Sequence, residues 1–428
     1  MGCVQEEPPR DLLLVTIDTT RVDGLGCYGG PDARTPRLDA LAEEGVRFEQ
    51  AITPAPYTGP SHASILTGLD PPRHGLRDFL NQAMDPEVAT LAEILRARGY
   101  RTAAFLSSYV LDRRFGLDRG FELYACDFWR QATGGAAPRI QQGSAEFERR
   151  GNLTVDEALR WMRETAGEGA PTFVWVHLFD PHMPYDPPPP YAPAPVPGLD
   201  ETEQARRRYY GEVAYTDAQI GRLLDRLRET DRSDRTIVAV AGDHGELLGQ
   251  HGRKLGTHST HLVEATLRVP LIVRVPGLRP AVVREQVRLV DLMPTLLELS
   301  GVEAPPDLDG RSLLPAMRGE PQPLPPAYSE TFYERFPAVA VPGEELVSLR
   351  RGTFRLLRSP ARRELYDLES DPDELQDVSA DHPEVVRALE SELRQRQARP
   401  APGEPSLNLD EEERERHLER LRALGYVR

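Results

Sequence analysis

Short runs of hydrophobic residues that end in polar residues or glycine recur along the chain and predict buried β-strands. The clearest runs are residues 12–17, 172–178 and 236–241, and an aspartate follows each of them within two residues. An apolar run without alternation is typical of a strand that is covered on both faces, as in a parallel sheet. Two further strands are expected at residues 102–106 and 270–275.

Between these runs, hydrophobic positions recur at helical spacing. Residues 35–45, 153–166 and 203–230 are expected to form helices with one apolar face. Strands that alternate with helices predict an α/β fold, in which helices cover both faces of a mostly parallel central sheet.

The pattern changes after residue 315, where a proline-rich stretch at 320–326 resembles a linker. Beyond it, short antiparallel strands are expected within 346–358 and 363–368, followed by a helix at 382–397. In the polar tail, Leu418, Leu421 and Leu424 are spaced to dock a terminal helix. We therefore expect a large unit at 1–318, a small α+β subdomain at 319–398 and a tail at 399–428.

Charge and terminal patterning narrow the class of protein. The 52 basic and 68 acidic residues give a net charge of −16, and no basic cluster is present, which argues against nucleic acid as the main ligand. The apolar run at 12–17 is too short for a signal-peptide core or a membrane span, so the chain as written is expected to be soluble. If the true start lies upstream, Cys3 becomes a candidate lipidated cysteine, and the protein would be periplasmic or lipid-anchored.

The segment TGPSHASILTG at 58–68 carries the first candidate chemistry. Pro60 suits the first position of a helix, so Thr58 is expected just ahead of a helix N-terminus, where anions are stabilised. Beside a metal ion, the Thr58 hydroxyl can act as a nucleophile. Without one, Thr58 is simply a helix cap. These residues alone leave both interpretations open.

A second candidate lies in the loop after the run at 236–241, where Asp243 and His244 are adjacent. Asp18, at the end of the run at 12–17, is the natural third partner, because ligand sites in parallel sheets lie at the carboxyl ends of strands. Two carboxylates, an imidazole and the Thr58 oxygen suit Mn²⁺ best, with Mg²⁺, Zn²⁺ or Ca²⁺ as alternatives. The other interpretation is a salt-bridged aspartate beside a capping histidine.

Several ordered stretches resemble the sulfatase family of the alkaline-phosphatase superfamily, among them LLLVTIDTTRVDGLGCYG, TGPSHASILTGL, WVHLFDPHMPY, AGDHGELLGQHG and ELYDLESDPDEL. The resemblance covers most of the chain and implies an alkaline-phosphatase-like α/β/α sandwich with a small C-terminal subdomain. It implies a catalytic role for the unit at 1–318. The family's nucleophile falls on Thr58, and its metal ligands fall on Asp18, Asp243 and His244. The substrate-contacting histidine of the family falls on His182.

The chain departs from the family pattern at the nucleophile and around it. The family's nucleophile is a cysteine or serine that becomes formylglycine, and Thr58 is not expected to undergo that conversion. Thr19 replaces a second aspartate, His62 replaces an arginine, and residues 106–109 lack the family's Lys-x-His segment. In formylglycine enzymes, the resemblance implies, the bound sulfate is expelled when a hemiacetal collapses. A threonine ester cannot collapse in that way and must be cleaved by a second in-line attack. This requirement favours phosphate or phosphonate esters over sulfate esters. One metal ion is expected, as in Thr-bearing relatives of the lipoteichoic-acid synthase type.

The remaining roles follow from the same resemblance. His182 is expected to protonate or stabilise the leaving group, and His62 either orients Thr58 or is a surface residue. Lys254, the only lysine, and His258 are candidates for contact with the anionic part of a glycan or lipid-head-group ester. His177 is expected to be a core histidine. The alternatives are a sulfatase that uses an unmodified threonine and a non-catalytic binder of an anionic glycan or lipid head group.

Overall fold

The structure is a computed structural model that describes residues 10–78, 80, 82–126, 148–167, 169–250, 253, 255–323, 325–332, 345–399 and 406–423. An eight-stranded sheet has the order β4-β3-β5-β1-β6-β7-β2-β8. Its strands are β1 (Asp11–Ile17), β2 (Val46–Ile52), β3 (Arg101–Leu106), β4 (Leu123–Ala125), β5 (Thr172–Leu178), β6 (Thr236–Gly242), β7 (Arg268–Arg274) and β8 (Ala281–Arg288). β7 is antiparallel to both of its neighbours, and the other pairs are parallel.

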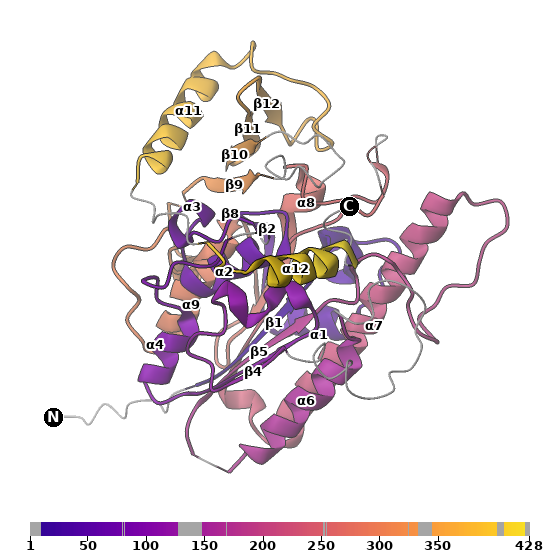
Figure 1. Cartoon of the computed structure of the whole chain (residues 1–428), viewed down its shortest axis with the longest axis vertical. Coiled ribbons are helices and arrows are strands. Elements are labelled where there is room, and N and C mark those ends of the chain that lie inside the picture. The colour runs from indigo at the N-terminus through magenta and orange to yellow at the C-terminus, as the bar shows by residue number, and fades with distance from the viewer. Residues whose placement is uncertain are drawn as a thin grey trace.

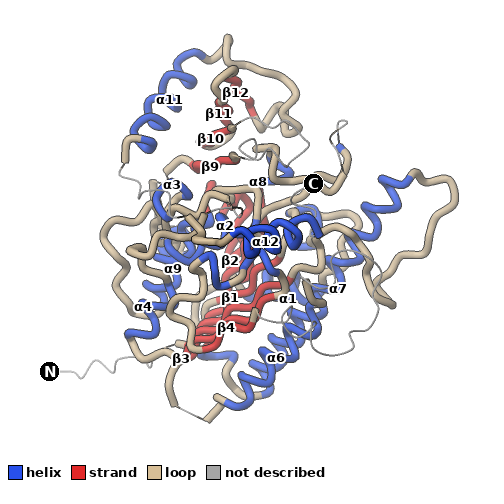
Figure 2. Tube along the Cα trace, in the orientation of Figure 1, coloured by secondary structure: helices blue, strands red, loops and turns tan. Residues whose placement is uncertain are grey.

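Helices lie on both faces of this sheet, as the tube view shows (Figure 2). The α-helices of the described residues before the second sheet are α1 (Pro36–Glu44), α2 (Thr58–Thr67), α3 (Pro71–His74), α4 (Leu91–Ala97), α6 (Gly151–Glu164), α7 (Glu201–Glu229), α8 (Glu264–Leu267), α9 (Leu292–Leu299) and α10 (Leu314–Met317). Alternate residues of β1 enter different cores: Leu12 and Leu14 pack with α2, α4 and α9, whereas Leu13 and Val15 pack with α1, α6 and α7. This two-sided burial explains why β1 is apolar without alternation.

A second, antiparallel sheet has the order β12-β11-β10-β9 and stands above the first in Figure 1. Its strands are β9 (Ala327–Thr331), β10 (Leu346–Arg351), β11 (Phe354–Arg358) and β12 (Arg363–Asp367), and α11 (Pro383–Gln397) packs on it through Leu389 and Leu393. β9 joins it to the first unit, because Glu330 N donates to Pro54 O at 2.9 Å and Ser329 Oγ donates to Thr53 O at 2.7 Å.

The tail helix α12 (Glu411–Ala423) crosses the front of the large unit in Figure 1. Leu421 is fully buried in the main core cluster and Leu418 packs against that cluster. Leu424, the third residue of the expected docking stripe, lies outside the described residues. His417 is also buried, and its Nδ1 lies 2.9 Å from the Tyr109 hydroxyl.

The predicted fold class is confirmed: a mostly parallel sheet between helices, with a small antiparallel unit after it. β2 and β8 were not expected from the sequence. β8 is an edge strand that reads AVVREQVR. It mixes exposed and buried positions, so it lacks the apolar run that marks a central strand. Among the described residues, no helix is both long and apolar enough to cross a lipid bilayer.

Candidate active site

Three loops meet at the carboxyl ends of the central strands. Ile17 at the end of β1 pairs with Leu178 of β5 on one side and with Gly242 of β6 on the other. The residues that follow are therefore neighbours: Asp18 N donates to Leu178 O at 2.9 Å, and Asp243 N donates to Ile17 O at 3.2 Å. The register of the sheet thus brings together two aspartates that are far apart in the sequence.

Thr58 contributes its hydroxyl to this cluster from α2. The helix begins at Thr58 itself, two residues before Pro60, where the first helical position was expected, and Thr58 follows extended Tyr57. Thr58 Oγ1 donates to Asp18 Oδ1 at 2.9 Å and lies 3.4 Å from His244 Nε2. The Thr58 side chain is fully buried among polar partners from two strand ends, which a helix cap alone does not require.

Asp18, Asp243 and His244 offer three ligand atoms within 4.8 Å of one another. His244 Nε2 lies 4.0 Å from Asp18 Oδ1 and 3.7 Å from Asp243 Oδ2. His244 Nδ1 donates to Gly245 O at 3.0 Å, so the lone pair is on Nε2, as metal binding requires. Asp18 Oδ2 and Asp243 Oδ2 have no hydrogen-bond partner among the described residues, although both are buried. The donor set fits one divalent ion.

The ionised forms of Asp18 and Asp243 are electrostatically unfavourable without a cation. Burial raises the pKa of both, and the negative charge of Asp243 raises the pKa of Asp18 further. Hydrogen bonds to Asp243 Oδ1 from His244 N at 2.7 Å and Thr19 N at 3.2 Å offset part of that cost. Thr19 has a φ of 48°, a strained conformation for threonine that directs its N–H at Asp243.

Replacing Asp243 with asparagine should stabilise the metal-free protein while weakening metal binding. Because folding raises both pKa values, the folded protein holds these two protons more tightly than the unfolded chain does. The protonated pair costs no stability below about pH 4, but the folded protein loses stability as the pair ionises with rising pH. The pair is therefore destabilising at neutral pH. An asparagine Nδ2 in place of Oδ2 would donate toward Asp18. We expect a gain of about 1–3 kcal/mol, or roughly 1–3 °C in Tm for a chain of this size.

The measurement is a thermal melt at neutral pH with chelator present. Exposed Asp381→Asn is the matched control, and its Tm should change by less than about 0.5 °C. A lower Tm for Asp243→Asn than for the parent protein would contradict this account of the two carboxylates.

His62 lies beneath Thr58 and is fully buried, so it is not a surface residue. Its Nδ1 donates to Thr58 O at 2.7 Å, and its Nε2 lies 2.9 Å from Thr16 Oγ1. Burial lowers the pKa of His62 to about 4, so the imidazole is neutral at pH 7. His62 therefore holds the backbone of the first helical turn rather than the Thr58 hydroxyl itself.

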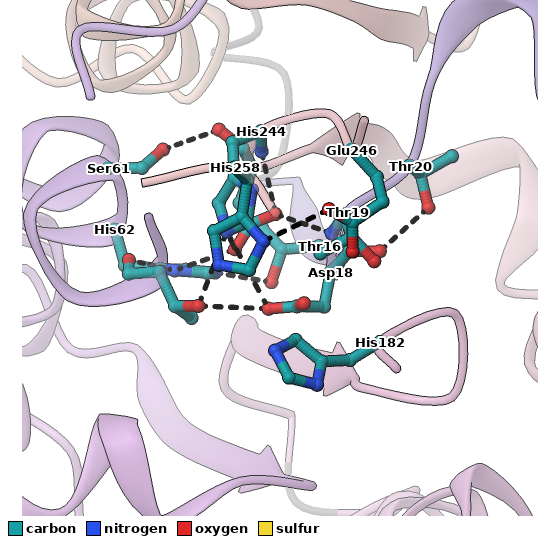
Figure 3. Close-up of polar contacts among 12 residues, drawn as sticks. Thr16, Asp18, Thr19, Thr20, Ser61, His62, His182, His244, Glu246 and His258 are labelled. Atoms are coloured by element: carbon teal, nitrogen blue, oxygen red, sulfur yellow. Dashed lines mark hydrogen bonds and ion pairs between the residues drawn. The ribbon is translucent and has the colours of Figure 1, made fainter. Parts of the chain in front are cut away.

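Two more histidines, His182 and His258, lie near the cluster, and in Figure 3 His182 stands apart from the other side chains drawn. His182 stacks on Phe179 with ring centroids 4.4 Å apart, and its Nδ1 donates to Met183 O at 2.7 Å. The His258 ring lies 5.6 Å from His182 and 4.6 Å from His244, by centroid. The pKa of His182 is lowered to about 3. Burial is the larger cause, and the nearby His258 is the smaller one.

Glu246 is a buried acidic residue at this site that the sequence did not single out. Its Oε1 lies 3.2 Å from His258 Nδ1, so it orients that ring. The sequence did carry a signal for Glu246: it lies in the same loop as Asp243. It is a third acidic residue, after Asp18 and Asp243, and no other role had been proposed for it. Lys254, the candidate anion-binding residue, lies outside the described residues.

Known proteins resemble the chain over most of its length. A family model described as sulfatase matches residues 10–302, and one described as the C-terminal part of N-sulphoglucosamine sulphohydrolase matches 258–399. An ulvan-active sulfatase of Formosa agariphila is 29% identical over 337 residues, covering 72% of this chain and 65% of that protein. Arylsulfatase K of Bos taurus is 25% identical over 453 residues, covering 92% of this chain and 83% of that protein.

Solved structures agree on the fold. The phosphonate monoester hydrolase of Agrobacterium radiobacter superposes with a TM-score of 0.74 at 22% identity, covering 91% of this chain and 95% of the other. A protein solved with its substrate D-glucosamine-2-N,6-O-disulfate gives a TM-score of 0.77 at 21% identity, with coverages of 92% and 99%.

Proposed function

The chain belongs to the sulfatase family of hydrolases, and from that premise we propose that it cleaves phosphate or phosphonate esters through a covalent intermediate on Thr58. The observation that carries the proposal is the Thr58 hydroxyl, which stands at the start of α2 and donates to Asp18 Oδ1 at 2.9 Å. An unmodified hydroxyl in this position forms an ester that only a second displacement can open. Phosphoryl transfer proceeds readily by two such displacements.

In the first half-reaction, Thr58 Oγ1 attacks phosphorus in line as the bond from phosphorus to the leaving oxygen breaks. Asp18 Oδ1 already accepts the Thr58 hydrogen, so it is the group placed to take the proton. A divalent ion held by Asp18, Asp243, His244 and the Thr58 oxygen would lower the pKa of the hydroxyl and offset charge on the non-bridging oxygens. His62 keeps the Thr58 carbonyl fixed while this happens.

His182 is the proposed proton donor to the leaving oxygen. Its Nδ1 proton is committed to Met183 O, so Nε2 is the atom that gains or loses a proton. In the ligand-free site this imidazole is neutral, because burial lowers its pKa to about 3. An anionic ester bound beside it favours the imidazolium form, which can then protonate the departing alkoxide.

In the second half-reaction, water or an acceptor alcohol attacks phosphorus and releases Thr58 Oγ1. The first acceptor makes the protein a hydrolase and the second makes it a transferase. The deprotonated His182 left by the first step can take the proton of the incoming nucleophile. The substrate is expected to be a small anionic ester on a glycan or lipid head group. The glycan is favoured by two solved structures that share the fold, one in complex with D-glucosamine-2-N,6-O-disulfate and one with k-i-k-neocarrahexaose.

A sulfatase that uses unmodified threonine is the second candidate, favoured by the names of relatives such as the ulvan-active sulfatase and arylsulfatase K. The experiment is a panel of nitrophenyl esters that share one leaving group and differ in the transferred group: phosphate monoester, phosphate diester, phosphonate and sulfate. The protein is loaded with Mn²⁺, and kcat/KM is measured for each ester. We expect the best phosphorus ester to exceed the sulfate by on the order of 100-fold or more, a difference of about 2.7 kcal/mol in transition-state stabilisation.

A sulfate ester turned over faster than every phosphorus ester would overturn the proposal in favour of the second candidate. Tight binding of the esters with no turnover of any of them would instead indicate a non-catalytic binder. The matched control is protein treated with chelator and then reloaded with Mn²⁺, which separates an inactive site from an empty one.

A further inference from the structure

A buried hydrogen-bond hub lies directly beneath the proposed metal site. Its centre is Thr16 of β1, which is fully buried. Thr16 Oγ1 lies 3.0 Å from Trp175 Nε1, 2.9 Å from His62 Nε2 and 3.0 Å from His177 Nδ1. A hydroxyl has one proton and two lone pairs, so these three contacts use its whole capacity.

The three contacts can be satisfied in only one way. The Trp175 Nε1–H can only donate, so it takes one lone pair of Thr16. His62 donates its Nδ1 proton to Thr58 O, so the Nε2 of a singly protonated His62 accepts the one Thr16 proton. The remaining lone pair of Thr16 then accepts from His177 Nδ1–H. A neutral His177 with its proton on Nδ1 presents a lone pair at Nε2.

His177 Nε2 lies at the candidate metal site without a partner of its own. The side chain is fully buried, and Nε2 has no hydrogen bond among the described residues. It lies 3.9 Å from Asp18 Oδ1. A ring nitrogen of His177 also lies within 4.8 Å of ligand atoms of His62 and Asp243, the residue that this group shares with the Asp18 and His244 cluster. A buried acceptor that faces an ionised carboxylate is unfavourable unless a cation lies between them.

We propose that His177 Nε2 is a further protein ligand of the divalent ion that Asp18, Asp243 and His244 bind. The proposal rests on the metal site of the proposed function. Two ligand atoms that each lie about 2.1 Å from one ion are at most about 4.2 Å apart, and the separation from Asp18 Oδ1 is within this limit. The Thr16 hub then acts as the outer-shell partner that fixes the ring and its tautomer.

A second imidazole changes which ion the site prefers. Imidazole nitrogen is a good ligand for Zn²⁺, whereas Mn²⁺, Mg²⁺ and Ca²⁺ are better suited by oxygen ligands. Competition among the four ions should therefore favour Zn²⁺ in the parent protein, and His177→Gln should narrow that preference. His62, which the same geometry brings near Asp243, is not a ligand, because its Nδ1 carries the proton given to Thr58 O.

The test is pulsed electron paramagnetic resonance of the full chain loaded with Mn²⁺, which detects directly bound imidazole nitrogens. The parent protein should give two bound histidine nitrogens and His177→Gln only one, with Mn²⁺ affinity lowered by about 10–100-fold. The control is His74→Gln, another fully buried histidine. Its Nε2 lies 3.0 Å from Ser64 Oγ and its Nδ1 accepts from Leu76 N at 3.2 Å, so both nitrogens are used away from the site.

The count in the parent protein needs no variant, so it decides the question even if His177→Gln fails to fold. One bound nitrogen in the parent protein overturns the role of His177 and leaves the metal site of Asp18, Asp243 and His244 intact. Two bound nitrogens that persist in His177→Gln also overturn it, because the second ligand is then another histidine. Failure of the parent protein to bind Mn²⁺ overturns both the metal site and this inference.

Discussion

Thr58→Ala is expected to abolish turnover of every ester while the protein keeps its metal ion. The substitution removes the oxygen that attacks phosphorus, and the loss of a nucleophile typically lowers kcat by a factor on the order of 10⁴–10⁶. Asp18, Asp243 and His244 remain, so the stoichiometry of bound Mn²⁺ should stay the same. The measurements are steady-state kinetics on the best ester of the panel and metal analysis of the same preparation.

Two further substitutions separate chemistry from packing at this position. Thr58→Ser keeps the hydroxyl and should retain activity within about tenfold, whereas Thr58→Val keeps the shape, loses the hydroxyl and should be as inactive as the alanine variant. Persistent turnover in Thr58→Ala or Thr58→Val would sink the assignment of the nucleophile. Cleavage of the esters would then be assigned to direct attack by water at the same metal site.

His182→Ala is expected to produce the second-largest effect, and one that depends on the leaving group. Alkyl phosphates release a strongly basic alkoxide that needs a proton, so kcat should fall by about 10²–10⁴. Nitrophenyl phosphate releases a stable anion, so its kcat should fall by less than about tenfold. The measurement is kcat for both esters in the parent protein and the variant, with the ratio between the esters as the informative quantity.

The control for this variant is His382→Ala, because the His382 side chain is 39% exposed and belongs to the small antiparallel unit. Its kinetics should match those of the parent protein for both esters. Equal losses for alkyl and nitrophenyl esters in His182→Ala would contradict proton donation and point instead to a role in binding or packing. The stacking of His182 on Phe179 makes that distinction necessary.

Much of the fold was accessible from the sequence, for identifiable physical reasons. The buried strands β1, β5 and β6 lack alternation of polar and apolar residues because helices cover both of their faces. An uninterrupted apolar run of this kind can be recognised from one sequence. The edge strand β8 has one face partly open to solvent, so its residues are mixed and its pattern is weak. The docking of α12 was foreseeable in part from Leu418 and Leu421, and both contact the main core.

Some residues of the candidate site could likewise be predicted from the sequence, and others could not. Asp18 and Asp243 could be paired in advance, because both follow strands of one parallel sheet and such ends lie together. The role of Thr58 came from the resemblance to a family, since a threonine at a helix start is ambiguous by itself. The environment of His177 was out of reach, because the position of its lone pair depends on Thr16, Trp175 and His62, from three different elements. Hydrogen-bond directions of that kind exist only after folding.

The most direct test of the central claim is to trap the covalent intermediate. Mn²⁺-loaded protein is mixed with a phosphate ester that carries a radiolabelled phosphoryl group, quenched in acid during turnover, and digested for peptide mapping. We expect label on Thr58 in the parent protein and none in Thr58→Val. Continued turnover with no label on Thr58, or label on a different residue, would contradict the claim.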